Sequence, residues 1–239
     1  GTVAKRKAAR PGAVPMAFWD FDGTIIEGDV SEGCYENGRS GRQIFRGLVE
    51  ETILAGLSPV YRGEAGWRQY HDIDYPRMNE IGRWLAWPYN AQIYEGVRAA
   101  ELDAFCAKKF DEVYSKHYFA SSVKMLRELE RAGVENYVVS ASPEIYVRNA
   151  AKTLGLPVER FRAIRVAVEG GRMTTKVIHP VPYGEGKVEN MRELTLSRPG
   201  GVAVAGFGNS YSTDGPFLKY IVNQSLPGGA KGFALMING

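Results

Sequence analysis

The sequence lacks the features that several common classes of protein require. Only two of its 239 residues are cysteines, Cys34 and Cys106, which lie far apart and form neither a CxxC motif nor a disulfide framework. We interpret both as buried free thiols, which suit a reducing compartment, and we expect a cytoplasmic protein. No apolar run approaches the ~18 residues that a membrane span needs, and no secretory signal opens the chain. We therefore expect no membrane partner.

Several catalytic signatures are missing as well. The three histidines, His71, His117 and His179, are scattered without HxxxH or HExxH spacing, so no zinc site is expected. The chain has no GxSxG motif, which argues against a serine hydrolase. Gly206–Gly208 has the spacing that begins a dinucleotide-binding loop, but Tyr211 stands where the third glycine is needed. A dinucleotide cofactor is therefore not expected.

Excess positive charge is confined to the first residues of the chain. The formal net charge is +3, and Lys5, Arg6, Lys7 and Arg10 supply four positive charges. The rest of the chain is therefore close to neutral, and we expect no nucleic-acid partner. We interpret residues 1–12 as a basic disordered tail, with binding to nucleic acid or anionic lipid as the less favoured alternative.

The sequence does contain an alternation of short apolar runs and helical patterns. These patterns predict strands at 15–19, 137–139, 202–205 and 232–237, a hairpin at 163–168 and 172–177, and helices at 122–131 and 185–196. Strands that alternate with helices form parallel βαβ units with right-handed crossovers. The stretch from Glu27 to His117 is different, because it is rich in aromatic residues, has several helical patterns and shows little strand character.

These patterns together predict the fold class. We expect an α/β protein with a doubly wound, Rossmann-like, mostly parallel sheet as its core. Residues 13–26 and 118–239 should build this core, and residues 27–117 should form a helical cap domain inserted after the first strand.

Polar side chains follow three of the predicted strands, where active sites of parallel sheets lie. They are Asp20 and Asp22 after the first strand, Ser140 and Ser142 after the second, and Asn209 and Asp214 after the third. Lys187 opens a predicted helix after a glycine-containing turn. Carboxylates, a hydroxyl and an ammonium are the groups that phosphoryl transfer requires. We interpret Ser142 as the cap of a helix that begins at Pro143 rather than as a catalytic group.

At these positions the chain resembles the haloacid dehalogenase-like hydrolases. Asp20-Phe21-Asp22-Gly23-Thr24 is similar to the first motif of that family, and the other three motifs follow in the family's order. Ser140 fits the second motif, Lys187 the third, and Gly208–Asp214 the fourth. The resemblance extends from Pro15 to about Phe217, and it is closest to the phosphoserine-phosphatase-like branch.

The resemblance implies a role for each of these residues. Asp20 would attack phosphorus and form an aspartyl-phosphate, held ionised by Mg²⁺ and Lys187, while Asp22 would act first as an acid and then as a base. Ser140 and Lys187 would contact the phosphoryl group. The implied magnesium ligands are Asp20, the backbone carbonyl of Asp22, Asn209 and Asp214. The implied substrate-binding residues are Gly23, Thr24, Ala141 and Asp29.

One residue departs from the family's pattern. Asn209 stands where the fourth motif usually begins with an aspartate. An amide oxygen can bind a hard cation, but the site loses one negative charge, so we expect weaker magnesium binding. Asp214 is the remaining acidic candidate, either as a ligand or by holding a ligated water.

The aromatic residues of the inserted stretch leave two interpretations open. They form an unusual concentration: Trp67, Tyr70, Tyr75, Trp84, Trp87 and Tyr89. The favoured interpretation is the core of a small helical cap. The alternative is the wall of a pocket for an amine-bearing substrate. Asp29 supports this alternative, because phosphoserine phosphatases keep an acid nine residues after the nucleophile, and Glu27 is a second candidate for that role.

The function expected from the sequence is the magnesium-dependent hydrolysis of a small phosphomonoester. A phosphotransferase or mutase is the nearest alternative, since the motifs barely separate the two activities. A non-catalytic binding protein on the same fold is the alternative from another class, and Asn209 is its only support. A dehalogenase is less favoured, because it has no need of a second carboxylate at Asp22.

Overall fold

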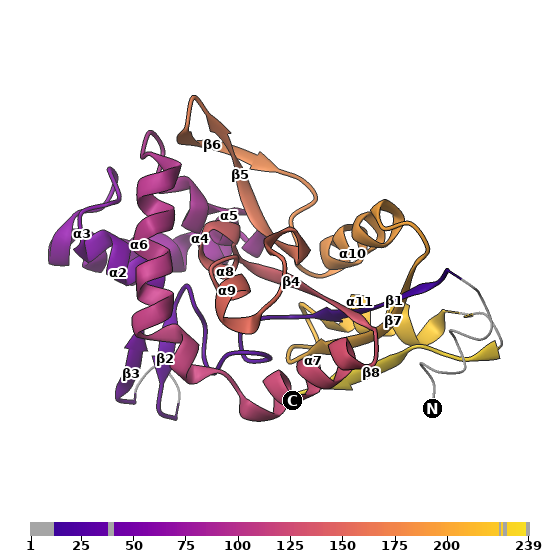
Figure 1. Ribbon diagram of the computed structural model, residues 1–239. Coiled ribbons are helices and arrows are strands. Elements are labelled where there is room, and N and C mark those ends of the chain that lie inside the picture. Colours follow the sequence, from indigo (N-terminus) through magenta and orange to yellow (C-terminus); the bar gives the residue numbers. More distant parts are fainter. Residues whose placement is uncertain (1–11, 38–40, 225, 227–228, 238–239) are drawn as a thin grey trace.

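The computed structural model describes residues 12–37, 41–224, 226 and 229–237 (Figure 1). The predicted basic tail lies outside the described residues except for Gly12, which forms a turn before the first strand. None of the helices within these ranges is long and apolar enough to cross a membrane.

A six-stranded sheet forms the centre of the molecule. Its strands lie in the order β6-β5-β4-β1-β7-β8, and all are parallel except β6, which pairs antiparallel with β5. The strands are β1 (Val14–Trp19), β4 (Glu135–Pro143), β5 (Phe161–Glu169), β6 (Arg172–Ile178), β7 (Gly201–Gly208) and β8 (Phe233–Met236). This arrangement confirms the predicted doubly wound α/β fold, including the hairpin and the edge strand.

The central strand β1 is apolar because both of its faces are covered. Met16 and Phe18 pack on one face, against helices α10 and α11, whereas Ala17 and Trp19 belong to the core cluster on the other face, with α7, α8 and α9. These helices are α7 (Ala120–Arg131), α8 (Glu144–Val147), α9 (Ala150–Leu154), α10 (Glu185–Ser197) and α11 (Gly215–Asn223). The alternation places successive side chains of one strand in two separate cores.

The segment between β1 and α7 is mainly helical and also contains two strands. Its elements are β2 (Gly33–Tyr35), β3 (Gln43–Arg46), α2 (Leu48–Leu54), α3 (Gly63–Arg68), a π-helix (Gln69–Asp74), α4 (Tyr75–Ile81), α5 (Arg83–Gln92), α6 (Ala99–Glu112) and a 3₁₀-helix (Tyr114–His117). The antiparallel pair β2–β3 was missed because three or four residues are too few to show the alternation of a strand.

The two connections of this segment to the core are bonded to each other. The backbone N–H of Glu27 donates to the carbonyl of His117, and that of Phe119 donates to the carbonyl of Ile25, both at 2.9 Å. The chain therefore leaves β1 and returns to α7 through a paired, two-stranded connection. This pairing fixes the position of the inserted segment relative to the sheet at the point where the two connections meet.

A second attachment joins the segment to the hairpin β5–β6, which lies beside α5 in Figure 1. Between α5 and α6, the N–H of Gly96 donates to the carbonyl of Met173, and the N–H of Ala99 donates to the carbonyl of Gly171, both at 2.9 Å. The inserted segment is thus attached to the core at two places that are distant in sequence.

The burial of Trp19 leads to a stability prediction. Its indole stacks on Phe207 with ring centroids 3.8 Å apart, and its Nε1 donates to Asn136 Oδ1 at 2.8 Å. Trp19→Phe should lower the free energy of unfolding by about 2–4 kcal/mol, because it leaves a cavity and an unpaired buried amide oxygen. Urea denaturation measures this change. Trp84→Phe, at a side chain that is 62% exposed, should change it by less than about 0.5 kcal/mol.

Candidate active site

A cavity of about 320 Å³ lies beyond the carboxyl ends of β1, β4 and β7. The core lines it with Asp20, Asp22, Gly23, Ala141, Ser142 and the loop 209–213, apart from the exposed Tyr211. The inserted segment lines its other side with Asp29, Ser31, Glu32, Tyr75, Arg83, Trp87 and Asn90. The predicted strand ends therefore meet at one place, which is where an α/β sheet binds its ligands.

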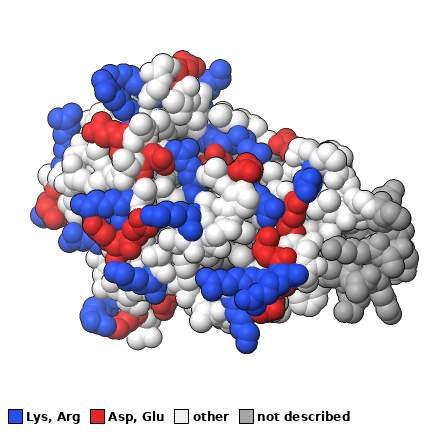
Figure 2. Space-filling view, viewed as in Figure 1, with Lys and Arg blue, Asp and Glu red and all other residues white. Residues whose placement is uncertain are grey.

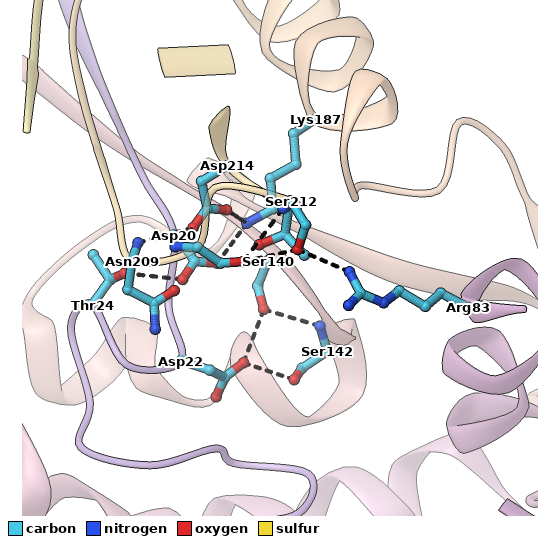
Figure 3. Close-up of polar contacts among 12 residues, drawn as sticks. Asp20, Asp22, Thr24, Arg83, Ser140, Ser142, Lys187, Asn209, Ser212 and Asp214 are labelled. Atoms are coloured by element: carbon cyan, nitrogen blue, oxygen red, sulfur yellow. Dashed lines mark hydrogen bonds and ion pairs between the residues drawn. The ribbon is translucent and has the colours of Figure 1, made fainter. Parts of the chain in front are cut away.

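Lys187 joins two of the predicted acidic residues. Its Nζ lies 2.5 Å from Asp20 Oδ1 and 2.7 Å from Asp214 Oδ1, and all three side chains are buried (Figure 3). Burial alone lowers the pKa of a lysine, but the two carboxylates outweigh it and raise the pKa of Lys187. The ammonium is therefore charged and held between the strand ends of β1 and β7.

The side chain of Asp20 is only 8% exposed. Thr24 Oγ1 donates to its Oδ2 at 3.0 Å. Burial raises the pKa of Asp20 to about 7, with Asp214 and Asp22 acting in the same direction and Lys187 opposing them. Lys187 lowers the pKa of Asp20 but does not outweigh burial, so a further positive charge at this site would favour the ionised carboxylate.

Asp22 is fixed by three hydrogen bonds. Its Oδ1 accepts from the N–H of Val30 at 2.7 Å, and its Oδ2 accepts from Ser142 Oγ at 2.7 Å and from Ser140 Oγ at 3.3 Å. Burial raises the pKa of Asp22, and the bonds from Val30 and Ser142 oppose this effect. The carboxylate thus faces the cavity with both oxygens engaged.

The interpretation of Ser142 as a helix cap is wrong. Strand β4 continues through Pro143, helix α8 begins only at Glu144, and no side-chain hydrogen bond caps it. In a strand, residues two apart point to the same face, so Ser140 and Ser142 both reach Asp22. The spacing of the two serines was therefore the sequence signal for this role.

Asn209 lies directly over Gly23, next to the two aspartates. Gly23 has φ = +68°, and an added Cβ atom there would lie 1.9 Å from Asn209 Nδ2. Only glycine leaves room for this amide. The oxygen atoms of Asp20, Asp22 and Asn209 are the hard donors that Mg²⁺ prefers.

The residues at this edge of the sheet fit a bound cation. Asp20 and Asp214 share one buried ammonium, and the carboxylate of Asp22 lines the same cavity as Asp20, so the carboxylates outnumber the ammonium. Within the described residues, no group of three or more His, Cys, Asp and Glu side chains is arranged to hold a metal. A cation here would therefore depend on the Asn209 amide and backbone oxygen as well as on carboxylate.

Asp214 is placed differently from the other predicted ligands. Its Oδ1 accepts from Lys187, and its Oδ2 accepts from the N–H groups of Asn209 and Ser210 at 2.9 and 3.0 Å. The side chain is fully buried and does not line the cavity. This geometry suits a residue that holds Lys187 and the loop carrying Asn209.

The predicted substrate-binding residues divide into two groups. Gly23, Ala141 and Asp29 line the cavity, whereas Thr24 is fully buried and contacts Asp20 instead. Asp29 Oδ1 accepts from the N–H groups of Ser31 and Glu32 at 2.7 and 2.9 Å. Burial and the nearby carboxylates of Asp22 and Glu32 raise the pKa of Asp29 well above its usual value.

Glu27, the other acidic candidate for an amine, is exposed and does not line the cavity. Glu32 does line it, and its Oε1 accepts from the Tyr75 hydroxyl at 2.8 Å. No pattern in the sequence selects Glu32, because its position depends on the turn that starts the inserted segment.

The structure places the six aromatic residues in different surroundings. Tyr70 is buried, Trp67 and Tyr89 pack against the core, and Trp84 is largely exposed. Tyr75 and Trp87 line the cavity. However, the ring of Trp87 already carries the Arg83 guanidinium at 5.1 Å from its centroid and an edge contact with Tyr183.

Arg83 was not selected from the sequence. Its Nη1 donates to Ser212 Oγ at 2.9 Å, which joins α5 to the loop after β7 across the cavity (Figure 3). Arg83, Trp87 and Asn90 are spaced i, i+4 and i+7, so they lie on one face of α5 and all line the cavity. The spacing of these residues was visible in the sequence. The sequence did not show that this face of α5 points toward the cavity.

Comparisons with known proteins agree with this geometry. The sequence profile described as haloacid dehalogenase-like hydrolase matches residues 17–219, whereas no curated protein matches the chain. Among solved structures, a protein of unknown function from Bordetella pertussis Tohama I is similar with a TM-score of 0.63 at 16% identity, covering 87% of each chain.

Two solved structures of named enzymes share the fold. An apo phosphoserine phosphatase has a TM-score of 0.52 at 13% identity, covering 94% of this chain and 93% of its own. Cytosolic 5'-nucleotidase IIIB bound to cytidine also has a TM-score of 0.52 at 13% identity, covering 98% of this chain and 75% of its own. With the profile match and the four motifs at one edge of the sheet, the chain belongs to the haloacid dehalogenase-like hydrolase family.

Proposed function

We propose that the protein is a phosphatase that hydrolyses a small phosphomonoester through an aspartyl-phosphate on Asp20. The observation that carries this proposal is the buried pair of Asp20 and Lys187 at the edge of a cavity that Asp22 also lines. A carboxylate held beside an ammonium, with a second carboxylate two residues away, provides a nucleophile, charge neutralisation and an acid–base group.

The chemical steps follow from these positions. An Asp20 oxygen attacks phosphorus while Lys187 neutralises part of the phosphoryl charge. Asp22 gives its proton to the leaving alcohol, and the carboxylate then takes a proton from the water that hydrolyses the aspartyl-phosphate. Ser140 donates to a phosphoryl oxygen, since its 3.3 Å contact with Asp22 is long and readily exchanged.

Mg²⁺ is the proposed cofactor. Asp20, the backbone carbonyl of Asp22 and the Asn209 amide would hold the ion, while Asp214 would position Lys187 and the loop that carries Asn209. When bound, the ion supplies positive charge that neutralises the phosphoryl group and the carboxylates around it. Because Asn209 is uncharged, this affinity should be lower than with an aspartate there.

We propose that residues 27–117 act as a cap that selects the substrate. Asp29 and Glu32 supply two acidic groups to the cavity, and the pKa of Asp29 is raised partly by this crowding. A cationic group between them relieves the repulsion, so an amine-bearing phosphomonoester is favoured. Trp87 is less suited to an amine, because Arg83 already occupies its ring.

The remaining expectations about partners and location stay predictions. On the face drawn in Figure 2, basic and acidic side chains are interspersed over most of the surface. Such mixing does not favour a nucleic-acid partner for that face. A cytoplasmic location and the absence of a membrane partner rest on the sequence alone. No contact in the cavity favours a phosphotransferase over a phosphatase.

The nucleophile is tested with Asp20→Asn. The amide keeps the shape of the side chain but cannot attack phosphorus, so hydrolysis of p-nitrophenyl phosphate with Mg²⁺ should fall at least a thousandfold, about 4 kcal/mol of barrier. Activity within about tenfold of the wild type would contradict the covalent mechanism. Asp111→Asn is a matched control, because Asp111 is exposed on α6, where its carboxylate pairs with Lys152.

The magnesium site is tested with Asn209→Asp. The added negative charge should lower the Mg²⁺ concentration needed for half-maximal activity, by about tenfold if the side chain binds the ion directly. Asn79→Asp makes the same charge change on the exposed surface of α4 and should leave the magnesium titration unchanged. An unchanged midpoint for Asn209→Asp would place this residue outside the metal's ligands.

The substrate preference is tested with Asp29→Asn. Loss of the carboxylate should reduce kcat/KM for phosphoethanolamine about tenfold more than for glycerol phosphate, because only the first carries an ammonium. Glu27→Gln removes a neighbouring acid that does not line the cavity and should affect both substrates alike. Equal losses in Asp29→Asn would show that Asp29 has a structural role and would leave the substrate class open.

A further inference from the structure

The acid–base group Asp22 has a closer hydroxyl partner than the serine of the second motif. Ser142 Oγ lies 2.7 Å from Asp22 Oδ2, whereas Ser140 Oγ lies 3.3 Å from the same atom. Hydroxyl-to-carboxylate hydrogen bonds are strongest at about 2.5–2.7 Å. Ser142, which lines the cavity, therefore holds the carboxylate more closely than the fully buried Ser140, whose Oγ also accepts from the N–H of Ser142 at 3.0 Å.

Ser142 is itself held by the inserted segment. The hydroxyl of Ser31 donates to Ser142 Oγ at 2.9 Å, and both serines are buried. A hydroxyl has one hydrogen to donate and can accept at its lone pairs. The chain of donors therefore runs in one direction, from Ser31 to Ser142 to Asp22, and each bond polarises the next.

The same segment also holds the other oxygen of the carboxylate. The N–H of Val30 donates to Asp22 Oδ1 at 2.7 Å, so adjacent residues of the chain reach Asp22 from both sides, one directly and one through Ser142. The first turn of the inserted segment and the end of β4 together fix the plane of this carboxylate. Acid catalysis depends steeply on such placement, because a proton must be delivered along a defined line.

We propose that Ser142 and Ser31 are positioning residues that orient Asp22 for acid–base catalysis. This inference rests on the proposed phosphatase function. Serine suits the task because its hydroxyl can donate to Asp22 while it accepts from Ser31, so the carboxyl group is held by donors and its own proton stays free for the leaving alcohol.

The test compares two esters of similar size that differ in their need for an acid. The phenol of phenyl phosphate is a poor leaving group that needs protonation, whereas the p-nitrophenolate of p-nitrophenyl phosphate leaves readily without it. Ser142→Ala should lower kcat/KM for phenyl phosphate about tenfold more than for p-nitrophenyl phosphate. Ser31→Ala should shift the ratio in the same direction by a smaller factor.

The double variant Ser31→Ala/Ser142→Ala tests whether Ser31 acts through Ser142 in this chain of hydrogen bonds. If Ser31 acts through Ser142, Ser31→Ala should cause no further change in the ester ratio when Ser142→Ala is already present. If the effects of Ser31→Ala and Ser142→Ala on the ester ratio were fully additive, the proposed chain of hydrogen bonds would be overturned. Ser58→Ala is the matched control, because it removes another buried serine hydroxyl of the inserted segment, which donates to the carbonyl of Ile93 away from the cavity.

Three further outcomes decide the proposal. An equal loss on both esters in Ser142→Ala, or no loss, overturns the positioning role. Binding of fluoroberyllate with Mg²⁺ should be the same in the wild type and Ser142→Ala, and weaker binding in the variant would assign Ser142 to the phosphoryl site instead. Failure of the wild type to hydrolyse either ester would overturn the phosphatase function itself, and with it this inference.

Discussion

The structure of the site depends on one buried ammonium. Removing a charge from water costs several kcal/mol, and Lys187 is stable in the interior only because Asp20 and Asp214 contact it at 2.5 and 2.7 Å. Asp214 can reach it because Gly208 has no side chain; a Cβ atom there would lie 2.6 Å from Asp214 Cβ. The ion pairs thereby tie β1, α10 and the loop after β7 together, and loss of any partner would leave an uncompensated charge in the core.

The same charges bear on the proposed order in which a cation and a phosphoester bind to the cavity. Asp20, Asp22, Asp29 and Glu32 line it, and the nearby Lys187 is already shared between two carboxylates. A doubly negative phosphoester entering alone would meet strong repulsion at this low-dielectric edge of the sheet. Burial raises the pKa of Asp20 to about 7, and the nearby carboxylates of Asp214 and Asp22 act in the same direction. Binding of metal and of substrate should therefore be coupled rather than independent.

Much of the core could be predicted because its signals are local. The apolar runs end in polar residues, which predicted that Asp20, Asp22 and Asn209 lie at one edge of the sheet. In the structure all three line the same cavity. The role of Ser142 was misjudged because Pro143 favours a helix start, while pairing with β5 extends β4 to that residue. Ser31, Glu32 and Arg83 could not be selected, since their positions depend on how the inserted helices pack.

The inserted segment and the acid–base group are therefore physically connected. The turn of residues 29–32 gives the cavity Asp29 and Glu32, and through Val30 and Ser31 the same turn holds Asp22. A shift of this turn to accommodate a different substrate must also move the donors that orient the acid. Under the proposed function, selectivity and chemistry share this one short stretch of backbone, and a substrate that fits the acidic end poorly should lose rate as well as affinity.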